Sequence, residues 1–389
     1  MLDIGSAAPD PQIHIFKAEC EIVAKQALEQ FLLNREAPDF LPNLYGGELG
    51  QLVALCSISR TLGGDAYKRE LSQVGDPSVY ASIDDGDYLS DIGLARGIGA
   101  LVYAQAVLSQ ATSEARHVDF AAAIARKALD NVEQSVADVE NLSDVMHGFA
   151  GLLIASCRTL EVSPQKALRE CVRGAAIRLA DVVGGLSPGF LARLGASAPH
   201  GLSGLGFALF LSGQTAQVEE AIVAGERCFS IEESLYCEEI LDWPDGRFAA
   251  LRASGAWCHG SAGVGMIRLS LKRQYDNAIG KTFDNVISLA VGSVLRLDLS
   301  PLQTACCGNC GRLEALAYAS SVLRNSDLSR LVKRLARCLL HQQFCSRRAN
   351  ASIVRDKSPG LFQGFHGMVD ILCRIAYEKP FPSFLAFEV

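Results

Sequence analysis

The stretch HGLSGLGFALFL, residues 200–211, places two glycines three residues apart at the start of an apolar helical segment. The same Gly-x-x-Gly step returns along the chain. Clear copies begin at Gly47, Gly148, Gly201, Gly260, Gly308 and Gly364, and a degenerate copy spans Leu94 to Gly99. The six intervals between Gly47 and Gly364 average about 53 residues, which is long enough for two helices and their loops. The sequence therefore predicts seven helical hairpins.

The segments between the glycine steps have helical periodicity. In residues 168–183, apolar side chains recur at three- and four-residue spacing with charged side chains between them, and residues 120–132 follow the same pattern. Hairpins of this kind bury their apolar faces only by stacking, either as an open solenoid or as a closed ring. We favour the ring, because the glycine step persists from Gly47 to Gly364 without distinct polar caps. The predicted fold class is all-α.

Composition restricts the classes of partner. The 389 residues are 49% hydrophobic and 20% charged, with a formal charge of −7. Because there is no run of Lys or Arg, the sequence gives no electrostatic footprint for nucleic acid or an anionic membrane. There is no signal-peptide pattern at the N-terminus and no uncharged apolar stretch of the roughly 18 residues that span a bilayer. We expect a cytoplasmic protein that acts on small molecules or peptides.

Three cysteines near two glycine steps predict a metal site. The chain has thirteen cysteines, an odd number at irregular spacing, which indicates free thiols. Cys258 lies in WCHG, residues 257–260, and Cys306 and Cys307 lie in CCGNCG, residues 306–311. Three thiolates would give zinc three sulfur ligands and leave the fourth position open, as catalytic zinc requires. Two alternatives use Cys310: a redox pair with Cys307, or a structural zinc site with four cysteines.

Histidines accompany the same glycine steps. Four of the seven lie in or beside one: His147, His200, His259 and His366. If the steps occupy equivalent places at one end of a ring, His200 and His259 face the same cavity as the cysteines. We interpret His147 and His366 as structural.

At these motifs the chain resembles lanthionine synthetase C-like (LanC-type) cyclases, and more closely the C-terminal cyclase domain of class II lanthipeptide synthetases. The family's Trp-Cys-x-Gly corresponds to residues 257–260, and its His-Gly-x-x-Gly to residues 200–204. Its Cys-His-Gly metal motif is Cys306-Cys307-Gly308 here, so that Cys307 stands where most members have His, as in a Cys-Cys-Gly subgroup. The family's aspartate before another glycine step matches Asp144.

The resemblance implies a seven-fold double α/α toroid. It also implies one cyclase domain over residues 1–389, with residues 1–40 as a helical lead-in. The implied reaction adds a peptide cysteine thiol to dehydroalanine or dehydrobutyrine, which forms a lanthionine or methyllanthionine thioether. The implied partners are a dehydrated precursor peptide and a dehydratase domain or protein.

Zn²⁺ held by Cys258, Cys306 and Cys307 would lower the pKa of a bound substrate thiol. Attack on the alkene then leaves an enolate that must be protonated. His200 is the first candidate for this proton transfer, since a histidine can both accept the thiol proton and return one. His259 is the second candidate, and Asp144 is expected to orient His200 or to cap a loop.

Other functions fit parts of the pattern. A LanC-like protein that binds zinc and a thiol such as glutathione without catalysis is the main rival. A protein prenyltransferase subunit also uses a helical ring and a zinc-activated thiol, but its Asp, Cys and His ligands do not match this cluster. A glycosidase on a helical ring is disfavoured, because no carboxylate pair marks the motifs.

Overall fold

The structure is a computed structural model that describes residues 11–33, 43–63, 67–84, 91–132, 142–245, 251–345 and 359–389. These residues form helices and two isolated β-bridges, Asn43 with Arg96 and Cys237 with Asp242, but no strand. The all-α prediction is therefore confirmed. Among the described helices, none combines the length and apolar character needed to cross a membrane.

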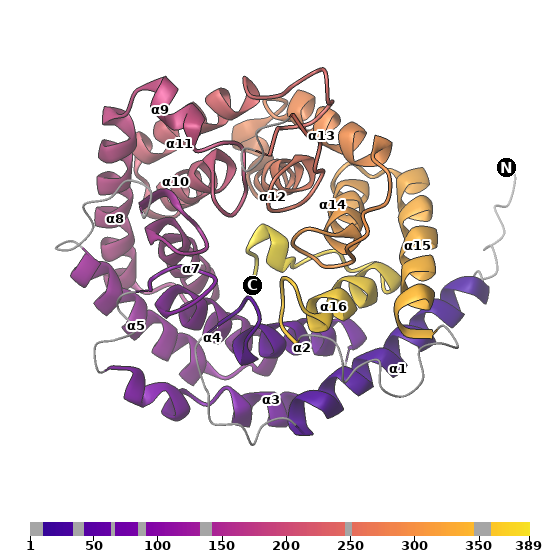
Figure 1. Cartoon of the computed structure of the whole chain (residues 1–389). Coiled ribbons are helices and arrows are strands. Elements are labelled where there is room, and N and C mark those ends of the chain that lie inside the picture. Colours follow the sequence, from indigo (N-terminus) through magenta and orange to yellow (C-terminus); the bar gives the residue numbers. More distant parts are fainter. Residues whose placement is uncertain are drawn as a thin grey trace, which may run out of the picture.

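Two concentric rings of helices make up the described part of the chain (Figure 1). The inner ring consists of α2 (Glu48–Leu62), α4 (Ile98–Thr112), α7 (Phe149–Val162), α10 (Leu202–Ala216), α12 (Ser261–Ile279), α14 (Asn309–Val322) and α16 (Phe365–Ala376). The outer ring consists of α1 (Pro11–Leu33), α3 (Lys68–Val74), α5 (Ala115–Val132), α8 (Lys166–Gly185), α11 (Glu219–Glu233), α13 (Asp284–Arg296) and α15 (Ser326–Leu340). Three short helices complete the outer ring: η1 (Pro77–Asp84), α9 (Pro188–Arg193) and η3 (His341–Cys345). A fourth, η4 (Phe384–Ala386), belongs to neither ring (Figure 1).

The inner ring is closed. Each inner helix contacts the next one along the chain, and the last, α16, contacts the first, α2. The outer partner of α16 is α1, from the opposite end of the chain, and His366 Nε2 lies 3.3 Å from the Ala27 carbonyl oxygen in this interface. The closed seven-fold toroid is thus confirmed, and the N-terminal helix completes its seventh pair.

Burial separates the two rings. Helix α10 is buried along nearly its whole length, whereas α8 buries one face and exposes the other. The buried face of α8 carries Leu168, Val172, Ala175, Ala176, Leu179, Ala180 and Val183. This amphipathic pattern is the one read from residues 168–183, because an outer helix has one neighbouring layer and one solvent face.

The C-terminal segment fills the centre of the ring, where η4 and the chain end lie in Figure 1. Its backbone carbonyls accept hydrogen bonds from the inner wall. Trp257 Nε1 donates to Leu385 O at 2.8 Å, Arg158 Nε to Phe387 O at 2.7 Å, and Tyr103 Oη to Glu388 O at 2.5 Å. The segment is therefore part of the packed core.

The second glycine of each clear step is required by a backbone contact. A Cβ atom there would lie 1.8–2.1 Å from the carbonyl oxygen six residues earlier. This holds for Gly50, Gly151, Gly204, Gly263, Gly311 and Gly367. The glycine lets the helix begin against its own preceding loop, so the loop folds back tightly at one end of every inner helix.

These loops are joined to one another by a belt of hydrogen bonds around the ring. Six joints are main-chain bonds: Leu44 N to Ala95 O (2.8 Å), Ala95 N to Met146 O (2.8 Å), Met146 N to Pro199 O (3.4 Å), Cys258 N to Cys306 O (3.2 Å), Cys306 N to Phe362 O (2.8 Å) and Phe362 N to Tyr45 O (3.4 Å). The belt returns to its starting loop, which fixes the seven loops in one register.

The seventh joint uses a side chain. Pro199 has no N–H to donate to the next loop. Ser197 Oγ takes over this function, because it donates to the Cys258 carbonyl at 2.5 Å and accepts from His200 N at 3.0 Å. Ser197 therefore ties the loop of His200 to the loop of Cys258.

We predict that Gly151→Ala destabilises the protein, because the added Cβ would meet Val145 O at 1.9 Å. Overpacking of a rigid site costs about 1–3 kcal/mol. Gly174→Ala is the matched control: Gly174 is within α8, and a Cβ there would meet only the end of the Arg178 side chain, at 3.4 Å. Its helix should gain about 0.5–1 kcal/mol. Urea unfolding of both variants measures these opposite effects. Equal stability of the two variants would show that a Cβ atom is tolerated at Gly151.

We also predict that Ser197→Ala loses about 1–3 kcal/mol of unfolding free energy, since it leaves a buried carbonyl and an N–H without their partner. Ser156→Ala controls for loss of a buried hydroxyl, because Ser156 Oγ donates to the Leu152 carbonyl within its own helix. Thermal melts and metal affinity should separate the two variants. A Ser197 variant with the same melting temperature and the same metal affinity as the Ser156 variant would contradict the role of Ser197 in the belt.

Candidate metal centre

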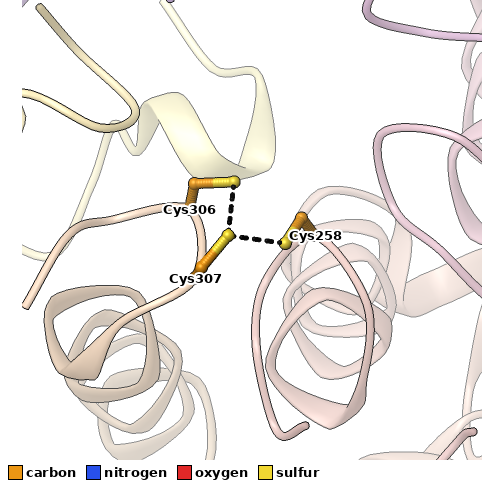
Figure 2. A group of neighbouring side chains, drawn as sticks. All are labelled: Cys258, Cys306 and Cys307. Atoms are coloured by element: carbon orange, nitrogen blue, oxygen red, sulfur yellow. Dashed lines mark hydrogen bonds between the residues drawn. The ribbon is translucent and has the colours of Figure 1, made fainter. Parts of the chain in front are cut away.

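Three cysteine sulfurs meet where two adjacent loops of the belt come together. Cys258 lies two residues before Gly260, the N-cap of α12. Cys306 and Cys307 precede Gly308, the N-cap of α14. Figure 2 shows the three side chains pointing toward one another from these two loops.

The sulfur geometry is compact. Cys307 Sγ lies 3.2 Å from Cys258 Sγ and 3.3 Å from Cys306 Sγ, and all three sulfurs lie within 4.8 Å of one another. All three cysteines are free; Cys258 and Cys306 are buried and Cys307 is half-buried. Sulfurs bonded to one zinc at about 2.3 Å stand about 3.8 Å apart in a tetrahedron. Opening the cluster by about half an ångström would therefore accommodate zinc.

The belt and an aromatic layer hold the two loops in place. Cys258 N donates to Cys306 O, and Cys306 N donates to Phe362 O. Next to Cys258 in the chain, the Trp257 ring stacks on Phe362, with centroids 5.1 Å apart and planes 21° apart. The same indole donates to the C-terminal segment at Leu385 O. The belt and these contacts of Trp257 together hold the cysteine backbones in place.

Electrostatics favour a cation in the cluster. Hydrogen bonds with Cys306 and Cys307, together with burial, raise the pKa of the Cys258 thiol. For Cys306, the hydrogen bond with Cys258 lowers the pKa, but the bond with Cys307 and burial outweigh it and raise the pKa overall. Negative charges this close repel one another, so the three groups cannot all become thiolates without a positive charge among them.

A tyrosine also reaches the cluster from across the seam, which is where the last inner helix, α16, meets the first, α2. Tyr45 Oη donates a hydrogen bond to Cys306 Sγ at 3.8 Å. Burial, followed by the negative charge of Cys306 and the hydrogen bond to it, raises the pKa of Tyr45. The phenol therefore stays protonated.

An aspartate–histidine pair lies on the neighbouring loops. His200 Nδ1 is 2.8 Å from Asp144 Oδ2, and Asp144 Oδ1 accepts from His147 N at 2.8 Å. Burial raises the pKa of Asp144, but the hydrogen bond and charge of His200 outweigh it and hold that pKa below its ordinary value. An ionised carboxylate only accepts, so Nδ1 carries the proton and Nε2 is left for acid–base work.

Three histidines from neighbouring loops lie against one another. The rings of His147 and His200 stack with centroids 5.9 Å apart, and those of His200 and His259 lie 5.8 Å apart. Because His259 follows Cys258 directly in the chain, these rings connect the loop of Asp144 with the loop of Cys258. His147, interpreted from sequence as structural, is exposed and lies against His200.

The remaining predicted residues lie elsewhere. Among the described residues, the group of possible metal ligands holds Cys258, Cys306 and Cys307 and does not include Cys310. Cys310 is buried in the first turn of α14. His366 is buried between α16 and α1, and burial lowers its pKa to about 4.

Sequence reasoning missed Tyr45 and Ser197. Tyr45 carried a usable signal, because it lies two residues before Gly47, in the same register as Cys258 before Gly260 and Cys306 before Gly308. Ser197 carried none, since its role depends on the missing N–H of Pro199 in the same loop.

Comparison with known proteins agrees with this architecture. The chain matches the family model described as "Lanthionine synthetase C-like protein" over residues 39–386. Its fold matches the solved structure titled "Nisin cyclase" with a TM-score of 0.66 and 16% sequence identity, covering 95% of this chain and 98% of that chain. No curated protein sequence matches it significantly. Because the family model covers nearly the whole chain, the protein belongs to the lanthionine synthetase C-like family.

Proposed function

We propose that this protein is a zinc-dependent lanthipeptide cyclase. Its substrate is a dehydrated precursor peptide, made by a dehydratase domain or protein. Its reaction joins a peptide cysteine thiol to dehydroalanine or dehydrobutyrine to form a lanthionine or methyllanthionine ring. The observation that carries the proposal is a cluster that holds three thiols among the described residues, on loops that adjoin those of an aspartate–histidine pair. We place the reaction in the cytoplasm, where free thiols persist.

The ligands we propose are Cys258, Cys306 and Cys307. Their donor set suits zinc, which prefers thiolates in a tetrahedral arrangement. Zinc, when bound, would supply the positive charge that keeps a substrate thiol in its thiolate form at neutral pH. The chain's own contribution is to hold three sulfurs from two repeats in fixed register and to leave room for one more ligand.

His200 is proposed to move the proton. Its Nε2 accepts the proton of the substrate thiol and returns a proton to the α-carbon after the sulfur has bonded to the β-carbon. Asp144 holds the ring through Nδ1 and stabilises the imidazolium between these steps. His259, whose ring lies against that of His200 and which follows Cys258 in the chain, is the second candidate for the same transfer.

The metal assignment predicts one zinc per chain in the purified protein. Cys306→Ala and Cys307→Ala should each lose the zinc and the cyclisation of a dehydrated cysteine-containing peptide, because two sulfurs cannot replace three. Cys338→Ala, an exposed thiol on the outer helix α15, is the control and should keep both. Elemental analysis gives the zinc content, and thiol alkylation with mass spectrometry follows cyclisation.

The zinc content and the cyclisation assay together distinguish a cyclase from a protein that only binds zinc, and from one without this metal site. Zinc without consumption of the peptide thiol would favour the LanC-like protein that only binds zinc and a thiol. No zinc in the wild type, or zinc that survives both cysteine variants, would overturn the metal site.

The acid–base assignment predicts that His200→Ala slows cyclisation by about 10²–10⁴-fold while the zinc content is unchanged. Asp144→Asn should slow it by about 10–100-fold, since the amide no longer fixes the tautomer. His341→Ala and Asp327→Asn are matched controls, because both residues form ion pairs on the outer helices, with Glu19 and Arg330. Steady-state rates at saturating peptide test this; a zinc-loaded His200 variant with the wild-type rate would contradict it.

A further inference from the structure

Tyr45 occupies the belt position that the cysteines occupy in other repeats. It lies two residues before the N-cap Gly47 of α2, as Cys258 lies before Gly260 and Cys306 before Gly308. Its loop adjoins that of Phe362, which in turn adjoins that of Cys306. The first loop of the ring therefore meets the metal centre only because the ring is closed.

The tyrosine ring is held in place on several sides. It stacks on Phe362, with centroids 5.8 Å apart and planes 24° apart. Its carbonyl accepts from Phe362 N at 3.4 Å, and its own N–H donates to Asn43 Oδ1 at 2.8 Å. With backbone and ring both fixed, the hydroxyl is directed at Cys306 Sγ, 3.8 Å away.

The hydrogen bond from Tyr45 affects how nucleophilic the Cys306 sulfur is. Three thiolates place three negative charges on a dication, and such sulfurs are nucleophiles in their own right. A cyclase must bring an electron-poor alkene next to them and yet let only the substrate sulfur react. A hydrogen bond withdraws electron density from the thiolate that accepts it, and groups outside the ligand shell commonly tune metal ligands in this way.

We propose that the Tyr45 hydroxyl tunes the metal centre by donating to Cys306, so that this ligand is a weaker nucleophile than the substrate thiolate. The inference rests on the proposed zinc cyclase. Without the bond, Cys306 Sγ adds to the β-carbon of a dehydroalanine, the alkene electrons move to the α-carbon, and a proton there completes a thioether to the enzyme itself. Tyr45 is thus a positioning and protecting residue across the seam.

The test uses Tyr45→Phe in the full chain loaded with cobalt(II). This change keeps the ring that stacks on Phe362 and removes only the hydroxyl. The thiolate-to-cobalt charge-transfer band should move to lower energy, and iodoacetamide should alkylate Cys306 about three- to tenfold faster, mapped by peptide mass spectrometry. Tyr377→Phe is the matched control, because that hydroxyl bonds Glu21 on the outer ring, and it should match the wild type.

A second variant avoids dependence on folding of the first. 3-Fluorotyrosine placed at position 45 keeps the hydroxyl and makes it a stronger donor, so the band should move to higher energy and the alkylation should slow. A band position and an alkylation rate that do not change in either variant would overturn the role of Tyr45. A wild type without a cysteine-dependent cobalt band would instead overturn the metal centre, so the two failures are distinguishable.

Discussion

The belt of hydrogen bonds between the glycine-step loops is the interaction on which the rest of the structure depends. Each loop leads into an inner helix and bonds to the next loop, through the main chain at six joints and through Ser197 at the seventh. In a closed ring these bonds fix every loop relative to all others. Cys258 and Cys306 are themselves a donor and an acceptor in the belt. The placement of their sulfurs is therefore a property of the whole ring.

Closure of the ring requires contacts at the seam between segments from opposite ends of the chain. Helix α1 packs on α16, and the loop of Phe362 bonds to the loop of Tyr45. Both contacts join residues more than 300 apart in sequence. The C-terminal segment supports the same region from the centre of the ring, through the hydrogen bond between Trp257 and Leu385. Substitutions that disrupt the seam should therefore also displace the cysteines.

Much of this could be predicted from the sequence, because the glycine steps are local and periodic. They give the number of repeats, the helical class and the meeting of the cysteine loops. The pairing of α1 with α16 could not be predicted, since an amphipathic helix carries no mark of which neighbour covers it. The role of Ser197 could not be predicted for a related reason, because it depends on which carbonyl of the next loop lies within reach, and only the register of the belt determines that. Tyr45 was missed although its place two residues before Gly47 matches that of Cys258 before Gly260.

The proposed metal centre requires the belt to present three cysteine sulfurs and one open coordination position. Zinc K-edge X-ray absorption of the zinc-loaded protein measures this ligand set. We predict three sulfurs at about 2.3 Å and one lighter ligand at about 2.0 Å, changing to four sulfurs when a cysteine-containing dehydrated peptide is added. Four sulfurs in the protein alone, which would require a further cysteine such as Cys310, or a shell dominated by nitrogen and oxygen, would contradict it.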